Sequence, residues 1–273
     1  MLERKIPSSG VNIPIIGLGT WKTFDKAPSI ESLDVLKNIV LKFYEIGGRL
    51  IDTSPMYGLA EENIGRIVSF LNFNNLLYAT KVWTSGKDAG IKQIEESFTK
   101  MKVSYIELFQ IHNLVDWKTQ IKSLKLLKEK GRIRYIGITH YHSGAFSEME
   151  KIIKLEKIDF IQIPYSIERV EAEESILPLC KDNGIAVLIN KPFEEGNLFR
   201  KVKNKVLPNS ALEIGIKTWA QFFLKYIISN DAVTCVIPAT DKLNHLEDNM
   251  HAGFGVLPNL GLRKEFRKYF LEL

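Results

Sequence analysis

The chain has 273 residues, 45% hydrophobic and 25% charged, a composition typical of a globular protein that buries its core without disulfide or metal staples. The net charge of +5 is scattered along the chain except for the basic turn from Lys128 to Arg134, which argues against nucleic-acid binding. The first residues contain no apolar targeting segment and no apolar run reaches ~18 residues, so we expect neither a signal peptide nor a membrane span. Cys180 and Cys235 lie far apart in apolar surroundings, which favours buried free thiols and a reducing, cytoplasmic location.

The first segment, ERKIPSSGVNIPII, predicts a small β-hairpin with its turn at residues 8–10. Short runs rich in Ile, Val, Leu and Phe follow, and their continuous apolar character indicates parallel strands buried on both faces. We predict eight such strands, at residues 15–21, 49–54, 76–82, 105–112, 133–139, 159–165, 185–191 and 233–239.

Segments with helical periodicity separate the predicted strands, and several end at a glycine. They cover residues 29–46, 61–70, 91–101, 117–130, 143–155, 171–181, 213–229 and 243–251. Eight strand–helix units within ~250 residues predict a (β/α)8 TIM barrel, with the hairpin at the barrel floor and residues 1–273 forming one domain. The tail, residues 259–273, is expected to pack outside the barrel. A doubly wound open sheet is the alternative fold, but its nucleotide-binding fingerprint is missing.

Four ionisable or polar residues stand at or just after the ends of three successive predicted strands. They are Asp52 and Tyr57 in DTSPMYG, Lys81 in ATKVW and His112 in QIHN. Taken singly, each has an ordinary structural explanation, as a turn aspartate, a loop anchor, a snorkelling lysine or a hydrogen-bonded core histidine. Barrel closure would point all four toward one mouth, where barrel enzymes carry their reacting groups.

These four side chains suit carbonyl reduction, which needs a proton donor beside a hydride donor. A tyrosine hydroxyl, with an ordinary pKa near ~10, becomes a better acid when an ammonium such as Lys81 stabilises its phenolate. Asp52 would hold Lys81 in place and charged, and His112 would orient the carbonyl oxygen for hydride attack. The set requires no metal.

With these motifs in place, the sequence resembles the aldo-keto reductase superfamily over essentially its whole length, from GLGTW to IPAT and HLEDN. The resemblance implies that Tyr57 is the general acid, that Lys81 and Asp52 tune it and that His112 orients the substrate. It also implies a nicotinamide cofactor, NADP with NAD possible, that lies extended across the barrel mouth without a Rossmann domain.

The resemblance extends, position by position, to cofactor-binding residues. Gln162 would hold the nicotinamide carboxamide, Gly196 and Leu198 would line the pyrophosphate, and Thr240 and Asn249 would contact the adenosine half. Further cofactor positions are Gly19, Thr20, Trp21, Thr139, His140, Asn190, Lys191, Ala239, Lys242 and His245.

Several of these positions depart from the family pattern. His140 replaces an amide, and Asn190 stands where a stacking tyrosine is usual. Ala239 and His245 replace two basic residues that often contact the 2′-phosphate of NADP. Lys242 could replace them, because a phosphate needs only a nearby cation.

Other patterns in the sequence do not indicate catalytic groups. Gly17-Leu18-Gly19 lacks the third glycine of a dinucleotide fingerprint, so we expect these glycines to allow a close backbone approach to cofactor or substrate. His140 and His142 have no acidic or cysteine partner at metal-ligand spacing, so no metal is expected. Glu194 and Glu195 are interpreted as solvated loop charges.

Two other functions remain open at this stage. The barrel could be a cofactor-bound regulatory subunit with little turnover, or an aldolase using Lys81 as a Schiff base. Trp21, Met56, Trp83 and Phe193 suggest an apolar pocket for a small-molecule carbonyl substrate. Since no pattern demands a partner chain, we expect a monomer.

Overall fold

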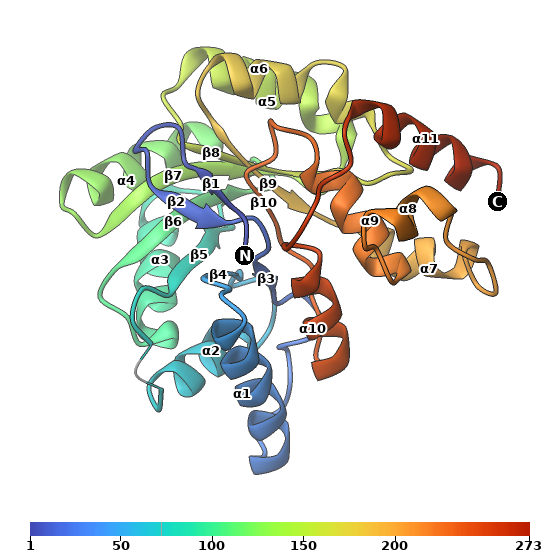
Figure 1. The fold of residues 1–273 in the computed structure, drawn as a ribbon. Coiled ribbons are helices and arrows are strands. Elements are labelled where there is room, and N and C mark those ends of the chain that lie inside the picture. Colours follow the sequence, from blue (N-terminus) through green and yellow to red (C-terminus); the bar gives the residue numbers. More distant parts are fainter. Residues whose placement is uncertain (72) are drawn as a thin grey trace.

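The computed structural model describes residues 1–71 and 73–273, and its central feature is a parallel sheet (Figure 1). Eight strands lie in the order β10-β9-β8-β7-β6-β5-β4-β3, each beside its neighbour in sequence. Their bounds are β3 Leu18–Gly19, β4 Leu50–Asp52, β5 Leu77–Val82, β6 Ile106–His112, β7 Ile133–Thr139, β8 Phe160–Pro164, β9 Ala186–Asn190 and β10 Cys235–Val236. Every one of these strands falls within a predicted apolar run.

The two edges of the sheet meet and close it into a barrel. Parallel bridges join Ile16 to Val236 and Gly19 to Ala239. Gly19 is needed here, because a Cβ atom at this position would lie 2.7 Å from the carbonyl oxygen of Ile237. The (β/α)8 barrel is therefore confirmed. Gly19 thus permits a close approach between strands, and the approach to a ligand that the sequence suggested stays a prediction.

The predicted N-terminal hairpin is also confirmed. β1 (Glu3–Lys5) pairs antiparallel with β2 (Asn12–Pro14), and Gly10, in the turn between them, has a φ of +73°. Ile6 and Ile13 of this hairpin pack against the lowest layer of side chains inside the barrel. The hairpin therefore covers the barrel floor.

Helices follow the strands and surround the sheet (Figure 1). Their bounds are α1 Ile30–Glu45, α2 Ala60–Val68, α3 Lys87–Met101, α4 Trp117–Glu129, α5 Phe146–Leu155, α6 Ile176–Asp182, α7 Asn197–Lys201, α8 Asn209–Glu213, α9 Trp219–Ile228, α10 Leu243–His251 and α11 Leu260–Leu271. Ser29 begins α1 as expected of a cap, since its hydroxyl accepts the backbone N–H of Ser32. No helix within residues 1–71 and 73–273 is both long and apolar enough to cross a membrane.

Two of the predicted helices are interrupted in the structure, and a third, residues 143–155, begins with a 3-10 turn, Ser143–Ala145, that continues directly into α5. Residues 171–181 divide into a short 3-10 turn, Glu171–Glu173, and α6. Residues 213–229 divide between the end of α8 and the whole of α9, because Gly215 between them adopts a left-handed φ of +80°.

The C-terminal tail forms α11, which packs outside the barrel on the side that carries α7, α8 and α9 (Figure 1). The ring of Phe266 in α11 lies 4.6 Å from that of Phe222 in α9. Cys180 and Cys235 are buried free thiols, as the sequence predicted. Between the strands and the helices lies the larger hydrophobic core, which includes Phe43, Phe109 and Ile161.

Candidate active site

A cavity of about 1220 Å³ opens at the end of the barrel where the parallel strands finish. That volume exceeds the ~300–1,000 Å³ usual for a single small ligand, and so suits a dinucleotide together with a substrate. Asp52, Tyr57 and His112 line it, and each comes from the end of a strand or from the loop that follows.

The alternation of side chains along each strand explains why polar groups gather there. Leu50, Ala79, Leu108 and Phe160 belong to the apolar layer inside the barrel. The residues two positions later point the same way, one layer nearer the mouth. Those residues are Asp52, Lys81, Gln110 and Gln162.

Asp52 is the centre of a buried hydrogen-bond network. Its Oδ2 accepts from Lys81 Nζ at 2.7 Å, while its Oδ1 accepts from Gln110 Nε2 at 3.0 Å and from Gln162 Nε2 at 2.8 Å. The side chain of Asp52 is only 3% exposed and that of Lys81 is fully buried. With three donors around it, the Asp52 side chain is held in one orientation.

Lys81 joins this network to the tyrosine. Its ammonium also donates to the carbonyl oxygen of Thr53 at 2.7 Å and lies 5.0 Å from the ring centroid of Tyr57. Burial by itself would lower the pKa of Lys81, but Asp52 and Tyr57 together raise that pKa above its ordinary value. Lys81 therefore stays charged at neutral pH.

Tyr57 is half-buried, and its ring lies close to both Lys81 and His112. Burial raises the pKa of the Tyr57 phenol above its ordinary value of 10, and the charge of Lys81 partly offsets this effect. The sequence suggested that Lys81 would dominate, whereas desolvation is the larger influence in the structure. The phenol consequently keeps its proton at neutral pH, while the ammonium beside it favours the phenolate that forms when the proton leaves.

His112 ends β6 at the cavity wall, edge-on to Tyr57 with the ring centroids 5.9 Å apart. Burial, together with the positive charges of Lys81 and His140, lowers the pKa of His112 to about 3. The imidazole is therefore neutral under ordinary conditions. A neutral imidazole can donate one hydrogen bond to a carbonyl oxygen without itself acting as the acid.

Most of the residues predicted to bind cofactor line the same cavity. They are Gly19, Thr20, Trp21, Thr139, Gln162, Asn190, Lys191, Gly196, Ala239, Thr240, His245 and Asn249. Asn190 Oδ1 is buried without a hydrogen-bond partner, as a group awaiting a ligand would be. The amide of Gln162 is partly engaged already, by Asp52 and by the hydroxyl of Thr139.

Three predicted cofactor residues lie outside this lining. Leu198 is fully buried in the hydrophobic core, so only its backbone could approach a pyrophosphate. His140 stacks on Tyr141 with the ring centroids 5.2 Å apart, and its Nδ1 accepts the backbone N–H of His142. Lys242 is exposed at the start of α10, next to the cavity residue Thr240.

The interpretation as solvated loop charges was wrong for Glu194, whereas Glu195 is an exposed loop residue as expected. Glu194 is 7% exposed, accepts a hydrogen bond from the hydroxyl of Ser166 and pairs with Arg169. Glu195 lines the cavity and pairs with Lys191 at 3.0 Å and with Lys22 at 3.1 Å. Both glutamates adopt left-handed backbone conformations, which these tertiary ion pairs help to hold.

Sequence reasoning also missed several cavity residues and two members of the buried network. The additional lining residues include Lys22, Tyr141, Phe199, Trp219 and Asp248. Gln110 could have been found, because it is a polar residue inside an otherwise apolar strand and lies two positions before His112. Ser54 contacts His112 from the DTSPMYG segment, where nothing local distinguishes it from an ordinary turn serine.

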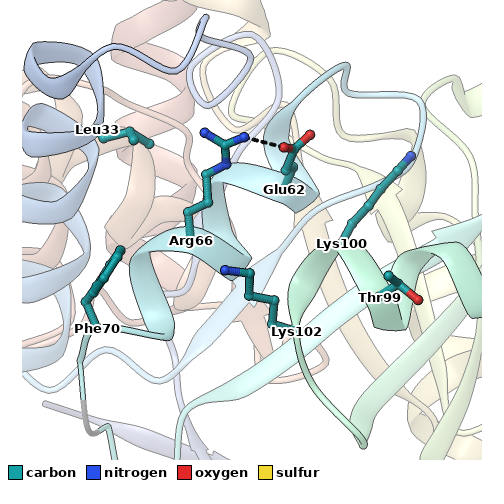
Figure 2. Close-up of a pocket in the computed structure, with 7 residues that line it drawn as sticks. All are labelled: Leu33, Glu62, Arg66, Phe70, Thr99, Lys100 and Lys102. Atoms are coloured by element: carbon teal, nitrogen blue, oxygen red, sulfur yellow. Dashed lines mark hydrogen bonds and ion pairs between the residues drawn. The ribbon is translucent and has the colours of Figure 1, made fainter.

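A second, smaller hollow of about 590 Å³ lies on the outside of the helical layer. Figure 2 shows Arg66 of α2 reaching toward Glu62, with Lys100 and Lys102 nearby. Because each helix runs back along its strand, the C-terminal ends of α2 and α3 lie toward the barrel floor, away from the mouth. The four residues proposed for chemistry do not line this hollow.

Fold and site together define a (β/α)8 barrel with its polar groups gathered at the C-terminal mouth, where barrels of this kind carry their reacting groups. Residues 15–259 match the aldo/keto reductase family, and the chain therefore belongs to that family of reductases.

Individual relatives agree with this assignment. The chain is 28% identical over 220 residues to aldo-keto reductase YhdN of Bacillus subtilis, a match that covers 72% of this chain and 63% of YhdN, less than two thirds of its length. It is 28% identical over 250 residues to the NADH-specific methylglyoxal reductase of Escherichia coli, covering 80% of this chain and 75% of the relative. An aldo/keto reductase from Klebsiella pneumoniae, crystallised with NADP and acetate, has the same fold, with a TM-score of 0.83 at 21% identity over 99% of this chain and 96% of that one.

Proposed function

We propose that this protein reduces the carbonyl group of a small aldehyde or ketone, with a nicotinamide cofactor bound across the barrel mouth. The observation that carries the proposal is the meeting of a protonated phenol and a neutral imidazole at the wall of one large cavity, with a buried ammonium beside the phenol. Family membership supports the same reaction class.

In this proposal each side chain at the mouth has a separate role in the reaction. The imidazole of His112 donates a hydrogen bond to the carbonyl oxygen and holds the carbonyl carbon toward the cofactor. A bound nicotinamide dinucleotide supplies the hydride. Tyr57 then gives its hydroxyl proton to the same oxygen, and the Lys81 ammonium stabilises the phenolate left behind. Asp52 keeps Lys81 in position throughout.

The raised pKa of Lys81 also favours this proposal over Schiff-base chemistry. An amine must lose its proton to attack a carbonyl, whereas the contacts of Lys81 with Asp52 and Tyr57 raise its pKa above the ordinary value.

The proposed cofactor is NADP, with NAD as the alternative. The lining residues fit a dinucleotide, since Gly196, with a φ of +90°, leaves open space at its surface and Asn190 offers an unpartnered amide oxygen. Among relatives and neighbours both choices occur, because the Klebsiella structure holds NADP and the Escherichia coli relative is named NADH-specific. Asn249 would meet the adenosine half.

A direct assay tests the proposed function. We expect oxidation of NADPH or NADH when the protein is mixed with methylglyoxal or a nitrobenzaldehyde, representing small polar and aromatic carbonyls. Since the pKa of His112 is lowered to about 3, the rate should show no inflection near the ordinary histidine value of 6.5 that traces to this residue. Absence of turnover with both cofactors across a broad carbonyl panel, despite cofactor binding, would favour a regulatory role instead.

Lys242 is the residue we propose for the 2′-phosphate of NADP. The neighbouring Asp241 pairs with Lys26 at 2.6 Å, and within residues 1–71 and 73–273 no ion pair engages Lys242 itself. Lys242 also stands at the N-terminus of α10, where the helix dipole favours an anion. We expect Lys242→Ala to raise the KM for NADPH several-fold and to leave the KM for NADH nearly unchanged.

The matched control is Lys264→Ala, which removes an exposed lysine from α11 and should change neither constant. Equal changes in the two Michaelis constants of the Lys242 variant would remove Lys242 from 2′-phosphate recognition.

A further inference from the structure

Ser54 makes a buried contact with His112 that the proposed chemistry has not yet used. Its Oγ lies 3.0 Å from Nδ1 of His112, and Ser54 is fully buried while His112 is 6% exposed. The same Oγ accepts the backbone N–H of Met56 at 3.2 Å.

The donors and acceptors available to Ser54 and His112 decide which of the two groups donates in this contact. A serine hydroxyl has one hydrogen to donate, and Met56 occupies an accepting position on the oxygen. Among the hydrogen bonds of residues 1–71 and 73–273, His112 Nδ1 is the side-chain atom that can accept the Ser54 hydrogen. If Nδ1 carried a proton and donated to Ser54 instead, the hydroxyl hydrogen would be buried without an acceptor.

The state of the imidazole makes the choice of proton position unambiguous. Lys81, Tyr57 and His140 are the ionisable groups around His112, and burial together with the positive charges of Lys81 and His140 lowers the pKa of the ring to about 3. A neutral imidazole carries one proton, so an accepting Nδ1 leaves that proton on Nε2. In the same described ranges no protein group is hydrogen-bonded to Nε2, and His112 lines the cavity.

We propose that Ser54 is a positioning residue that holds His112 in the tautomer protonated on Nε2, so that the ring presents a donor to the substrate oxygen. This inference rests on the proposed carbonyl reduction for its purpose, but the tautomer itself is a property of the free protein. Ser54 does not touch the reacting atoms in this proposal, and it acts only through His112.

The main chain around Ser54 is hydrogen-bonded to two further residues of the site. The carbonyl oxygen of Ser54 accepts the N–H of Tyr57 at 3.0 Å, and the carbonyl oxygen of Thr53 accepts from Lys81. The two residues after β4 therefore contact Tyr57, Lys81 and His112 at once. Replacing the Ser54 side chain removes only the contact with His112 and with the N–H of Met56, since the carbonyl contacts belong to the main chain.

The test compares Ser54→Ala with Ser54→Thr, which keeps a hydroxyl. Side-chain ¹⁵N–¹H correlation spectra of His112 in the substrate-free protein report which ring nitrogen carries the proton. We expect the proton on Nε2 in the unmodified protein, a mixture or the Nδ1 form in Ser54→Ala, and restoration of the Nε2 form in Ser54→Thr. Ser97→Ala, which removes a buried hydroxyl from α3, should leave the spectrum unchanged.

Turnover gives a second readout. We expect kcat of Ser54→Ala to fall roughly tenfold to a hundredfold, by analogy with the loss of an outer partner that orients a metal-bound histidine. Cofactor affinity should be retained, and Ser54→Thr should recover most of the rate. A proton on Nδ1 in the unmodified protein, or an unchanged tautomer in Ser54→Ala, would overturn the proposal. If Ser54→Ala does not fold, the spectra of the unmodified protein and of Ser54→Thr still show which nitrogen of His112 carries the proton. If the tautomer behaves as expected but no carbonyl is reduced, the proposed function fails while the role of Ser54 in holding the ring stands.

Discussion

Replacing Tyr57 with phenylalanine should lower kcat for carbonyl reduction by at least ~100-fold, the usual contribution of a positioned general acid. The substitution removes only the hydroxyl oxygen, so the ring keeps its edge-on packing against His112. Because Tyr57 is one of many residues that line the cavity, cofactor affinity should change little. Steady-state kinetics and a fluorescence titration with NADPH measure the two quantities separately.

Tyr269→Phe provides the matched control. Tyr269 lies in α11 and does not line the cavity, and its hydroxyl donates to the carbonyl oxygen of Val206, so its loss should leave kcat nearly unchanged. A Tyr57→Phe enzyme that keeps most of its turnover would mean that another group delivers the proton. Equal loss of cofactor binding and turnover would instead mean that Tyr57 has a structural role.

Replacing Asp52 with alanine should lower the free energy of unfolding by about 3–5 kcal/mol, as expected when one partner of a buried ion pair is removed. The remaining Lys81 ammonium would be fully buried, with the Thr53 carbonyl oxygen as its surviving hydrogen-bond acceptor. Gln110 and Gln162 would each lose an acceptor as well. Urea unfolding followed by circular dichroism measures the change, and catalysis should be lost with it.

Asp231→Ala tests whether burial is the cause. Asp231 also pairs with a lysine, Lys181 at 2.6 Å, but the two side chains are 74% and 59% exposed. Solvent screens such a pair, so its removal should change stability far less. Similar losses in the two variants would contradict the idea that the Asp52–Lys81 pair is a special, desolvated part of the barrel interior.

Much of the molecule follows from local patterns in the sequence. Apolar runs bounded by turn residues locate the barrel strands, and the spacing between runs leaves room for helices, because strand and helix periodicities are properties of short segments. The alternation along the strands likewise relates Leu50 to Asp52 and Ala79 to Lys81. Resemblance to a known family then suggested roles for residues that periodicity alone could not assign.

Other features exist only once the barrel has closed. The hydrogen bond from Gln110 to Asp52 joins β6 to β4, which are not neighbours in the sheet, so no local pattern predicts it. Glu194 became a buried partner of Arg169 because the loop after β9 folds back onto the chain after β8. Leu198, which follows the same loop, is buried in the hydrophobic core, and this burial likewise depends on contacts that form only in the folded chain.

The sequence by itself therefore determined where the strands lie and which residue types reach the mouth of the barrel, because both depend on periodicity within a few residues. Only the tertiary structure decided the partners of those residues, the neutral state of His112 and the proton retained by Tyr57. Burial and the proximity of charges set these properties, and both depend on segments that are distant in the chain and meet only in the folded protein.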